Sequence, residues 1–332
     1  MRHALSSPGK AGRSAACRLA IPLLWLAAAA CCGAGERSRE PSLAEFLSRM
    51  KDPRTFFLRV LPGDGHGAVI VGGNRLHPNQ IAKMRFLSSR RSRAPLVSVS
   101  GIRTEPFTAL VDPASTWSWM TLTAALRLDA VPLGPGIPWQ FPDHLQRGSL
   151  RGAVCRVSTL LMDTLRVESA LVLVSETPEL GPLSRGNRPV PELVLGSILL
   201  SRFRSLAFDF PGRKLLAAST FPYQPDPGKL VGTASFRWKG SLPLIEARVN
   251  GIPRDLIFDP AGDFALLLPE LREPATVKQL TLGDLVLRSV AAVPQVDPPV
   301  AGTRYGRIGR RCLEDFKVTL VSPPGRAYFE RP

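Results

Sequence analysis

Two aspartates stand at matching places in the two halves of this 332-residue chain. Asp112 follows an apolar run that ends in Val111, and Asp259 follows one that ends in Phe258. In both copies the next two residues are Pro and Ala. Carboxyl groups are common general acids and bases, and a carboxylate at the end of a buried strand is costly unless it is paired or used. Two such positions suggest that the carboxylates meet.

The sequence around these aspartates is repeated, and the repeat extends to the end of each half. Ahead of each aspartate, an alternating strand pattern (residues 95–102 and 243–252) runs into a Gly turn, and a second strand carries the Asp. Further along, residues 195–203 align with 308–316, and Pro211-Gly212-Arg213 aligns with Pro324-Gly325-Arg326. Both later alignments keep the same offset, which indicates an internal duplication.

This order of elements resembles one lobe of an aspartic peptidase: apolar-apolar-Asp, then apolar-apolar-Gly, then a short helix and a closing strand. Two lobes in one chain are similar to the pepsin arrangement, and their short, simple form resembles the retropepsin type. The resemblance covers residues 95–332. It implies an all-β fold of duplicated β-barrel lobes with short helices and a cleft between them. Lobe 1 would be 95–222 and lobe 2 would be 229–332, after a Pro-rich linker.

The resemblance also implies a reaction, the hydrolysis of peptide bonds by an endopeptidase in which Asp112 and Asp259 form a dyad. Two carboxyl groups that lie so close together cannot both be ionised, because their negative charges repel each other. The pair therefore shares one proton. The ionised carboxylate takes a proton from water while its partner donates to the scissile carbonyl oxygen, without a covalent intermediate, metal or cofactor. The expected substrate is an extended peptide or protein segment in the cleft.

Both triplets depart from the family pattern, which is Asp-Thr-Gly or Asp-Ser-Gly. Pro113 and Pro260 lack the hydroxyl and the amide N–H with which the family's loops grip each other. Ala114 and Ala261 place a methyl group where Gly permits close approach of the backbone. The departure bears directly on whether the dyad is active.

The residue after each triplet differs between the two loops. By resemblance, Ser115 supports the outer oxygen of Asp112, whereas Gly262 stands at this place in the second loop. Two interpretations stay open. In one, the rigid Pro loops hold an active dyad by a different route. In the other, each Asp caps its own turn, and the chain is an inactive homologue that binds a peptide or a cell-envelope partner in the cleft.

A flap is the other element that the resemblance implies, near residues 145–155. In the family this β-hairpin closes over the substrate, and an ordinary hairpin is the alternative here. The candidate flap residues are Gly148, Ser149, Leu150, Arg151 and Gly152. The preceding stretch, 131–142, is rich in Pro and Gly and is expected to be a loop.

The first 32 residues are typical of an export signal, with basic residues followed by the apolar run Leu19 to Ala30. The run is short for a membrane span, and no other stretch suits one, so we expect no transmembrane helix in the mature chain. Ala28-Ala29-Ala30-Cys31 resembles a lipoprotein box, which makes Cys31 a candidate for lipidation. Simple signal-peptidase cleavage is the alternative. The expected location is periplasmic, membrane-anchored as a lipoprotein, or secreted.

Residues 33–94 form an N-terminal segment and a basic linker. The pattern over 41–50 predicts a short helix, and 68–71 predicts a strand. The apolar face of this helix would consist of Leu43, Phe46, Leu47 and Met50. The basic run 88–94 is either the site where a propeptide is excised or a solvated surface linker.

Composition bears on which partners, disulfides and metal sites are expected. Lys and Arg number 43 against 27 Asp and Glu, so the formal net charge is +16, which suits anionic envelope surfaces or reflects an Arg-rich solvated face. We expect no nucleic acid partner, because no binding motif is present and the export signal argues against one. Only Cys155 and Cys312 lie in the lobes, and the four His are scattered, so neither a disulfide framework nor a metal site is implied.

Overall fold

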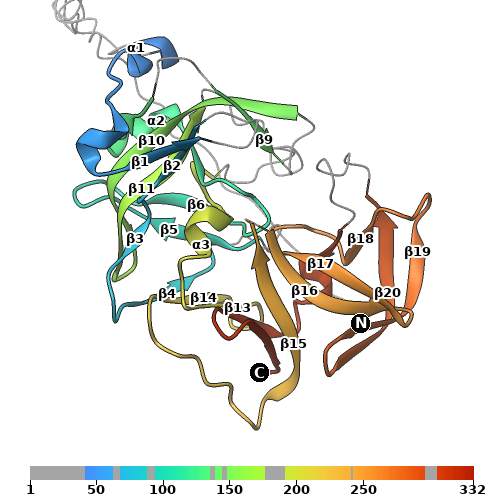
Figure 1. Cartoon of the computed structure of the whole chain (residues 1–332). Helices are drawn as coiled ribbons and strands as arrows, with labels where there is room; N and C mark the ends of the chain where they lie inside the picture. The colour runs from blue at the N-terminus through green and yellow to red at the C-terminus, as the bar shows by residue number, and fades with distance from the viewer. Residues whose placement is uncertain are drawn as a thin grey trace, which may run out of the picture. The chain divides into compact units, whose positions relative to one another are not determined.

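The computed structural model describes residues 42–62, 68–87, 94–134, 139–143, 148–175, 191–240, 242–295 and 305–332. The leader 1–32 with Cys31, the basic run 88–93 and the tip of the candidate flap, 144–147, lie outside these ranges. The chain separates into residues 1–40 and a compact unit of residues 41–332. The compact unit is mostly β with short helices, so the predicted all-β class is confirmed at this level (Figure 1).

A mixed sheet contains Asp112's strand, and we call it the first sheet. In pairing order, its strands are β5 (Leu96–Val99), β6 (Phe107–Val111), β12 (Leu193–Leu195), β7 (Trp119–Thr121), β11 (Leu165–Ser175), β10 (Gly148–Met162) and β8 (Val131–Pro132). Ser100, just after β5, exchanges two backbone hydrogen bonds with Leu161 of β10, at 3.1 and 2.8 Å. This bridge joins β5, at one end of the pairing order, to β10, near the other end.

A closed barrel contains Asp259's strand. In pairing order, its strands are β17 (Ile252–Asp259), β21 (Gly306–Gly309), β18 (Leu266–Leu268), β20 (Leu285–Pro294), β19 (Ala275–Leu282) and β16 (Leu242–Val249). The pairing of β16 with β17 closes it. Asn250 and Gly251 connect these two strands with φ of 50° and 84°, the left-handed conformations that a tight hairpin requires. The sequence therefore fixes the hairpin that presents Asp259.

An antiparallel sheet, here called the connecting sheet, continues from the barrel. In order, it contains β15 (Leu230–Lys239), β23 (Arg326–Glu330), β22 (Lys317–Val321), β13 (Ser205–Asp209), β14 (Lys214–Ala218) and β4 (Ile81–Arg85). At its centre Leu206 lies opposite Leu320, and Ala207 lies opposite Thr319. All four are buried, so this pair of strands is part of the core.

The helices are short, and residue types typical of helix caps begin two of the α-helices. Ser42 and Glu45 form a capping box at α1 (Leu43–Leu47), which is shorter than the predicted helix 41–50. Thr121 caps α2 (Leu122–Arg127) through a hydrogen bond from the amide of Ala124. The remaining short helices are η1 (Pro53–Phe56), α3 (Ser197–Leu200) and η2 (Arg310–Cys312).

The N-terminal segment contributes strands to the folded unit. The predicted strand 68–71 is confirmed as β2 (Ala68–Val71), which pairs with β1 (Arg59–Pro62). β3 (Arg75–Leu76) pairs with β11 of the first sheet. β4 is the edge strand of the connecting sheet, where Ala82 and Met84 are buried.

One expectation was wrong: the stretch 131–142 is not a continuous loop. It contains β8, and its last residues begin β9 (Trp139–Asp143). Pro and Gly indicate breaks in regular structure. Here the long strand β10 offers a free row of backbone groups, and β9 pairs with it at the sheet's margin, where Pro142 is tolerated.

A buried carboxylate, that of Glu330 at the end of β23, is held by three partners. Lys317 lies 3.1 Å from Glu330 Oε2, and the Tyr223 hydroxyl donates to the same oxygen. The amide of Asp226 donates to Oε1 at 2.9 Å. Lys317 also donates to the Tyr223 hydroxyl oxygen at 2.7 Å. Paired in this way, the buried charge is tolerated.

Burial and these bonds alter two pKa values. Burial raises the pKa of Tyr223, and its bond to Glu330 raises it further. Burial alone lowers the pKa of Lys317, but the bonds to Tyr223 and Glu330 outweigh burial and leave it raised. Both groups therefore keep their protons more firmly in the folded state than in the unfolded state.

We expect the free energy of unfolding to be at its full value below about pH 10 and to fall as pH rises through the raised pKa values of Tyr223 and Lys317. Urea titrations across this range would measure the loss. The Tyr223→Phe, Lys317→Met double variant should be less stable at neutral pH and should lose less on further alkalinisation. A double variant with the parent's alkaline slope would contradict the assignment.

Candidate functional site

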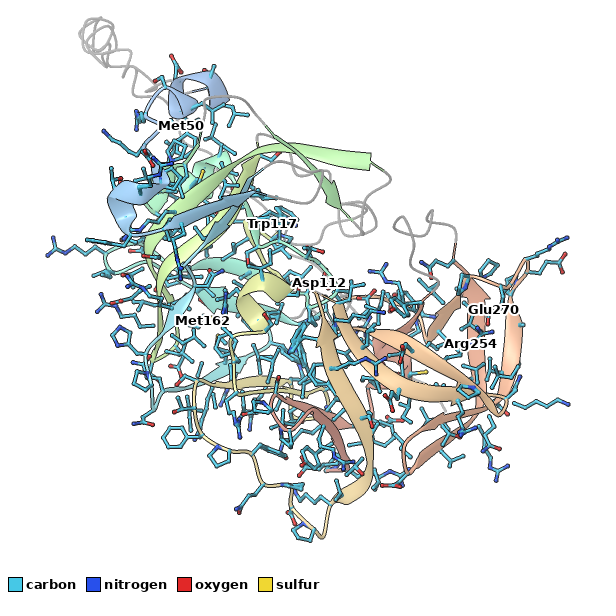
Figure 2. The ribbon with its side chains drawn as sticks, in the orientation of Figure 1. Met50, Asp112, Trp117, Met162, Arg254 and Glu270 are labelled. Carbon is cyan, nitrogen blue, oxygen red and sulfur yellow. The ribbon has the colours of Figure 1, made fainter. Side chains whose placement is uncertain are left out.

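Asp112 directly follows β6 and has no exposed surface. Its Oδ1 accepts a hydrogen bond from the amide of Ala114 at 3.0 Å, the geometry of an Asx turn. The backbone amide of Asp112 donates to the carbonyl oxygen of Leu195 on the parallel strand β12 at 3.0 Å. Figure 2 labels Asp112 where β6 ends. The aspartate thus fixes the loop that it begins.

Asp259 ends β17 and is 1% exposed. Its Oδ1 accepts from the amide of Gly262 at 2.9 Å. Its Oδ2 lies 3.4 Å from Nε of Arg307, a buried residue of β21. Within the described ranges, Nε and Nη2 of Arg307 have no hydrogen-bond partner, so the attraction to Asp259 is an ion pair without hydrogen-bond geometry.

The two Asp-Pro-Ala loops place their alanines against opposite parts of the molecule. Ala114 is fully buried in an apolar cluster of barrel residues. That cluster contains Leu242, Leu244 and Ile257. Ala261 packs against an apolar cluster of the first sheet. That cluster contains Ala94, Leu96, Leu110 and Trp119. Each loop is therefore half of a contact that joins the first sheet to the barrel.

A glycine in each half lets the Asp loop approach the next strand. Gly196 follows β12 and Gly309 ends β21, and both have φ of −95°. A Cβ atom on Gly196 would lie 2.2 Å from the carbonyl oxygen of Trp117, and one on Gly309 would lie 2.3 Å from that of Phe264. These glycines are needed for lack of a side chain and not for an unusual φ.

The approach allows matching backbone hydrogen bonds. The amide of Ser197 donates to the Ser115 carbonyl at 2.7 Å, and the amide of Arg310 donates to the Gly262 carbonyl at 3.0 Å. The side-chain hydroxyl of Ser115, which the resemblance assigned to the outer oxygen of Asp112, donates instead to the carbonyl oxygen of Trp117 at 3.0 Å. Ser115 therefore stabilises the shape of the loop.

Gly262 supports Asp259 through its backbone, although its sequence position offers no side-chain hydroxyl like that of Ser115. Its amide supplies the hydrogen bond to Asp259 Oδ1. A Cβ atom there would lie 2.3 Å from the ring of Phe264 and 2.9 Å from Asp259 Oδ2. Pro113 and Pro260 are both buried at the second position of their loops.

Arg307 is the residue that sequence reasoning missed. The duplicated stretches align it with Val194, a buried residue of β12. An arginine at the place of a buried valine, next to an aspartate-bearing strand, is the signal that could have found it. Its pairing partner on β17 is Ile257, which belongs to the cluster around Ala114.

The candidate flap is a β-hairpin. β9 pairs antiparallel with the start of β10, so Gly148 lies opposite Asp143 and Gly152 lies opposite Trp139. The other candidates, Ser149, Leu150 and Arg151, lie between these two glycines on β10. That the hairpin closes over a ligand stays a prediction.

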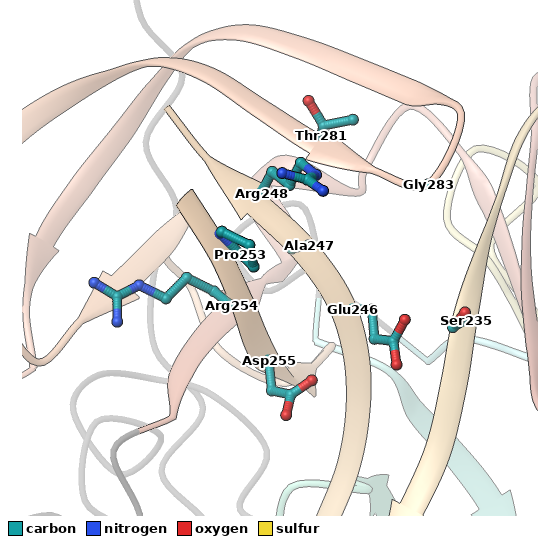
Figure 3. Close-up of a pocket in the computed structure, with 9 residues that line it drawn as sticks. All are labelled: Ser235, Glu246, Ala247, Arg248, Pro253, Arg254, Asp255, Thr281 and Gly283. Atoms are coloured by element: carbon teal, nitrogen blue, oxygen red, sulfur yellow. The ribbon is translucent and has the colours of Figure 1, made fainter. Parts of the chain in front are cut away.

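A pocket of about 480 Å³ lies on the barrel, away from both aspartates (Figure 3). It is lined by Ser235, Glu246, Ala247, Arg248, Pro253, Arg254, Asp255, Thr281 and Gly283. Arg237 binds Glu246 and Asp255 at 2.7 and 2.6 Å, and Arg254 lies 2.9 Å from Glu270. Glu246, Arg254 and Asp255 of this lining are held in ion pairs and neither Asp112 nor Asp259 belongs to it, so we do not regard it as the candidate site.

No protein-family model matches the chain, and a search of curated proteins found no match. In the described part of the chain, no group of three or more His, Cys, Asp or Glu is arranged to hold a metal ion. None of the described helices is long and apolar enough to cross a membrane. The functional assignment therefore depends on the geometry of the two Asp loops.

Gly196→Ala should lower the free energy of unfolding by about 3 kcal/mol, because the new methyl group would overlap the Trp117 carbonyl. Urea denaturation would measure it. Gly228→Ala is the matched control, since its Cβ would lie 3.4 Å from Asp226 Oδ1. Equal stability of the two variants would show that the loop does not require the glycine.

Arg307→Val should also destabilise the fold by about 3 kcal/mol, because it leaves the Asp259 carboxylate buried without its cation. Asp259→Asn should destabilise it as well, since Arg307 then loses its anion. The double variant should lose less than the sum of the two single losses. Strict additivity in this cycle would mean that the two charges do not interact.

Proposed function

We propose that this protein is a two-lobed, aspartic-peptidase-like protein that binds an extended polypeptide between its lobes without hydrolysing it. The lobes would be residues 95–222 and 229–332, in a protein exported by its leader. The two aspartates then act as structural anchors for the loops at the lobe interface. This function unites the duplicated sequence, the paired loops and the departures from the family triplet.

Matched strand registers support the duplicated lobes. In each half, the strand before the Asp strand pairs with it in the same way, and the later apolar-apolar-Gly strand lies parallel to it at the same residue. The matching pairs are Leu96–Leu110 with Leu244–Ile257, and Leu195–Val111 with Ile308–Phe258. The bridge between Ser100 and Leu161 in the first half corresponds to the pairing of β16 with β19 in the barrel.

The centre of the connecting sheet supports an approximate twofold relation between the lobes. By the sequence alignment, Leu206 corresponds to Thr319 and Ala207 corresponds to Leu320. In the sheet, Leu206 pairs with Leu320 and Ala207 pairs with Thr319. Each residue thus faces the counterpart of its neighbour, as strands related by a twofold axis do.

The observation that carries the absence of hydrolysis is the buried Arg307 beside Asp259. A dyad requires two carboxyl groups that face each other and an attacking water. Both oxygens of Asp259 are engaged within the barrel, one by the Gly262 amide and the other by the ion pair with Arg307. The first lobe has Val194 at this position, so the two carboxylates stand in unlike surroundings.

The residues of the two Asp loops also support the absence of hydrolysis. A family hydroxyl would join the two loops by a hydrogen bond, and Pro113 and Pro260 have none. The contact that remains between loop and opposite lobe is the apolar packing of Ala114 and Ala261. Such packing holds the lobes together but does not orient carboxylates toward a substrate.

A polypeptide is the ligand that suits this arrangement. Extended segments bind β-rich proteins by adding main-chain hydrogen bonds to exposed strands, with side chains held in pockets. Among the described strands β9 pairs only with β10, so its other edge is where we expect such a segment to add. Specificity would then come from the segments around the two Asp loops.

The purified protein, incubated with a mixture of denatured proteins and peptides from about pH 3 to 8, should retain peptides and cleave none. Peptide capture and mass spectrometry would follow both outcomes in parallel with Asp112→Asn and Asp259→Asn. Asp284→Asn is a matched control, because this aspartate accepts only a surface hydrogen bond from Thr233 among the contacts seen, at 2.7 Å.

Cleavage that is lost in both dyad variants and kept in Asp284→Asn would overturn the proposal and establish an active peptidase. A protein that neither captures nor cleaves any peptide would exclude both interpretations. Capture without cleavage by parent and variants alike, at a temperature where all of them are folded, is the expected result.

A further inference from the structure

Phe57 combines two unusual features. Its side chain is 93% exposed, the largest fraction among the large hydrophobic residues described. Its φ is +58°, in the left-handed region that bulky residues rarely adopt. The other described residues with positive φ that are not Gly are Asn, Asp, Ser or Arg. Gly or Asn would be the ordinary choice at this C-cap of η1, so a phenylalanine here calls for a reason.

The turn around Phe57 is anchored on both sides. Asp52 caps η1 by accepting from the amide of Arg54 at 2.8 Å, and the amide of Phe57 donates to the Arg54 carbonyl at 3.0 Å. Leu58 is 2% exposed in the apolar cluster of the first sheet. The half-buried ring of Phe56 lies 4.6 Å from the guanidinium of Arg156. Phe57 is therefore held outward by its neighbours.

Exposed cations flank Phe57 in the sequence. They are Arg49, Lys51, Arg54 and Arg59. The one carboxylate in this stretch, Asp52, serves as the helix cap. An aromatic ring among basic side chains is the combination that anionic lipid surfaces attract, because the ring enters the interface while the cations meet the head groups.

We propose that this turn docks the protein on an anionic phospholipid surface, with Phe57 inserted among the head groups and the four basic residues against the phosphates. A protein partner would require a groove or a broader apolar face, whereas the flanking residues Arg54, Thr55 and Arg59 are exposed and polar. The strained backbone at Phe57 has a use in this arrangement, since it directs the ring away from the folded unit.

Co-sedimentation with vesicles of phosphatidylcholine, with or without phosphatidylglycerol, tests the proposal. The full chain and the chain without residues 1–32 would both be used, so that binding by the leader is separated from binding by the turn. We expect binding to the anionic vesicles by both forms, weakened by salt. Phe57→Ser should reduce it roughly tenfold or more, since the ring's burial in lipid is lost.

Two further variants distinguish loss of the Phe57 ring from misfolding as the cause of weaker binding. Phe57→Gly should bind as weakly as Phe57→Ser while keeping the parent's melting temperature or exceeding it, because Gly adopts the positive φ without strain. Phe221→Ser, at a residue that is 40% exposed elsewhere, should bind like the parent. Equal binding by Phe57→Ser and the parent would overturn the proposal, and so would binding only by the full chain or equally to neutral vesicles.

Discussion

The reciprocal packing of two alanines against opposite apolar clusters is the contact on which the geometry of the candidate site depends. Ala114 is buried among barrel residues, and Ala261 packs on the first sheet. Both alanines can reach across because each aspartate first fixes its own turn, through Asp112 Oδ1 or Asp259 Oδ1. The contact is a non-directional burial of methyl groups, because Pro113 and Pro260 beside these alanines have no hydroxyl for a directed hydrogen bond. Such a contact resists separation well and rotation poorly.

The matching strand pairings around the two Asp loops make the differences between these loops informative. Gly196 and Gly309 have nearly the same backbone angles and the same close approach to a loop carbonyl. Val194 and Arg307 occupy corresponding strands with opposite character. The buried guanidinium of Arg307 lies beside Asp259 and changes the electrostatics of that loop, while the backbone pairing of β17 with β21 does not depend on that side chain.

Much of this architecture was readable from the sequence because it follows from local patterns. Alternating apolar residues and turns predicted the strands before each Asp, and the shared offset of Gly196 and Gly309 predicted corresponding strands and short helices. What could not be read depends on contacts between distant segments. The ion pair of Arg307 requires β21 to lie beside β17, and β9 exists because β10 extends past its other partners. Gly262 donates through its amide, a group that residue type alone does not reveal.

The edge position of β4 has a consequence for the integrity of the chain. Five residues of this strand pair with β14, and Ala82 and Met84 are buried in the core. A protease that cut the basic run 88–93 would therefore sever the covalent link without removing the strand, because hydrogen bonds and buried side chains would retain it. The product would be a nicked heterodimer, in which the N-terminal fragment persists as a bound subunit and leaves only on denaturation.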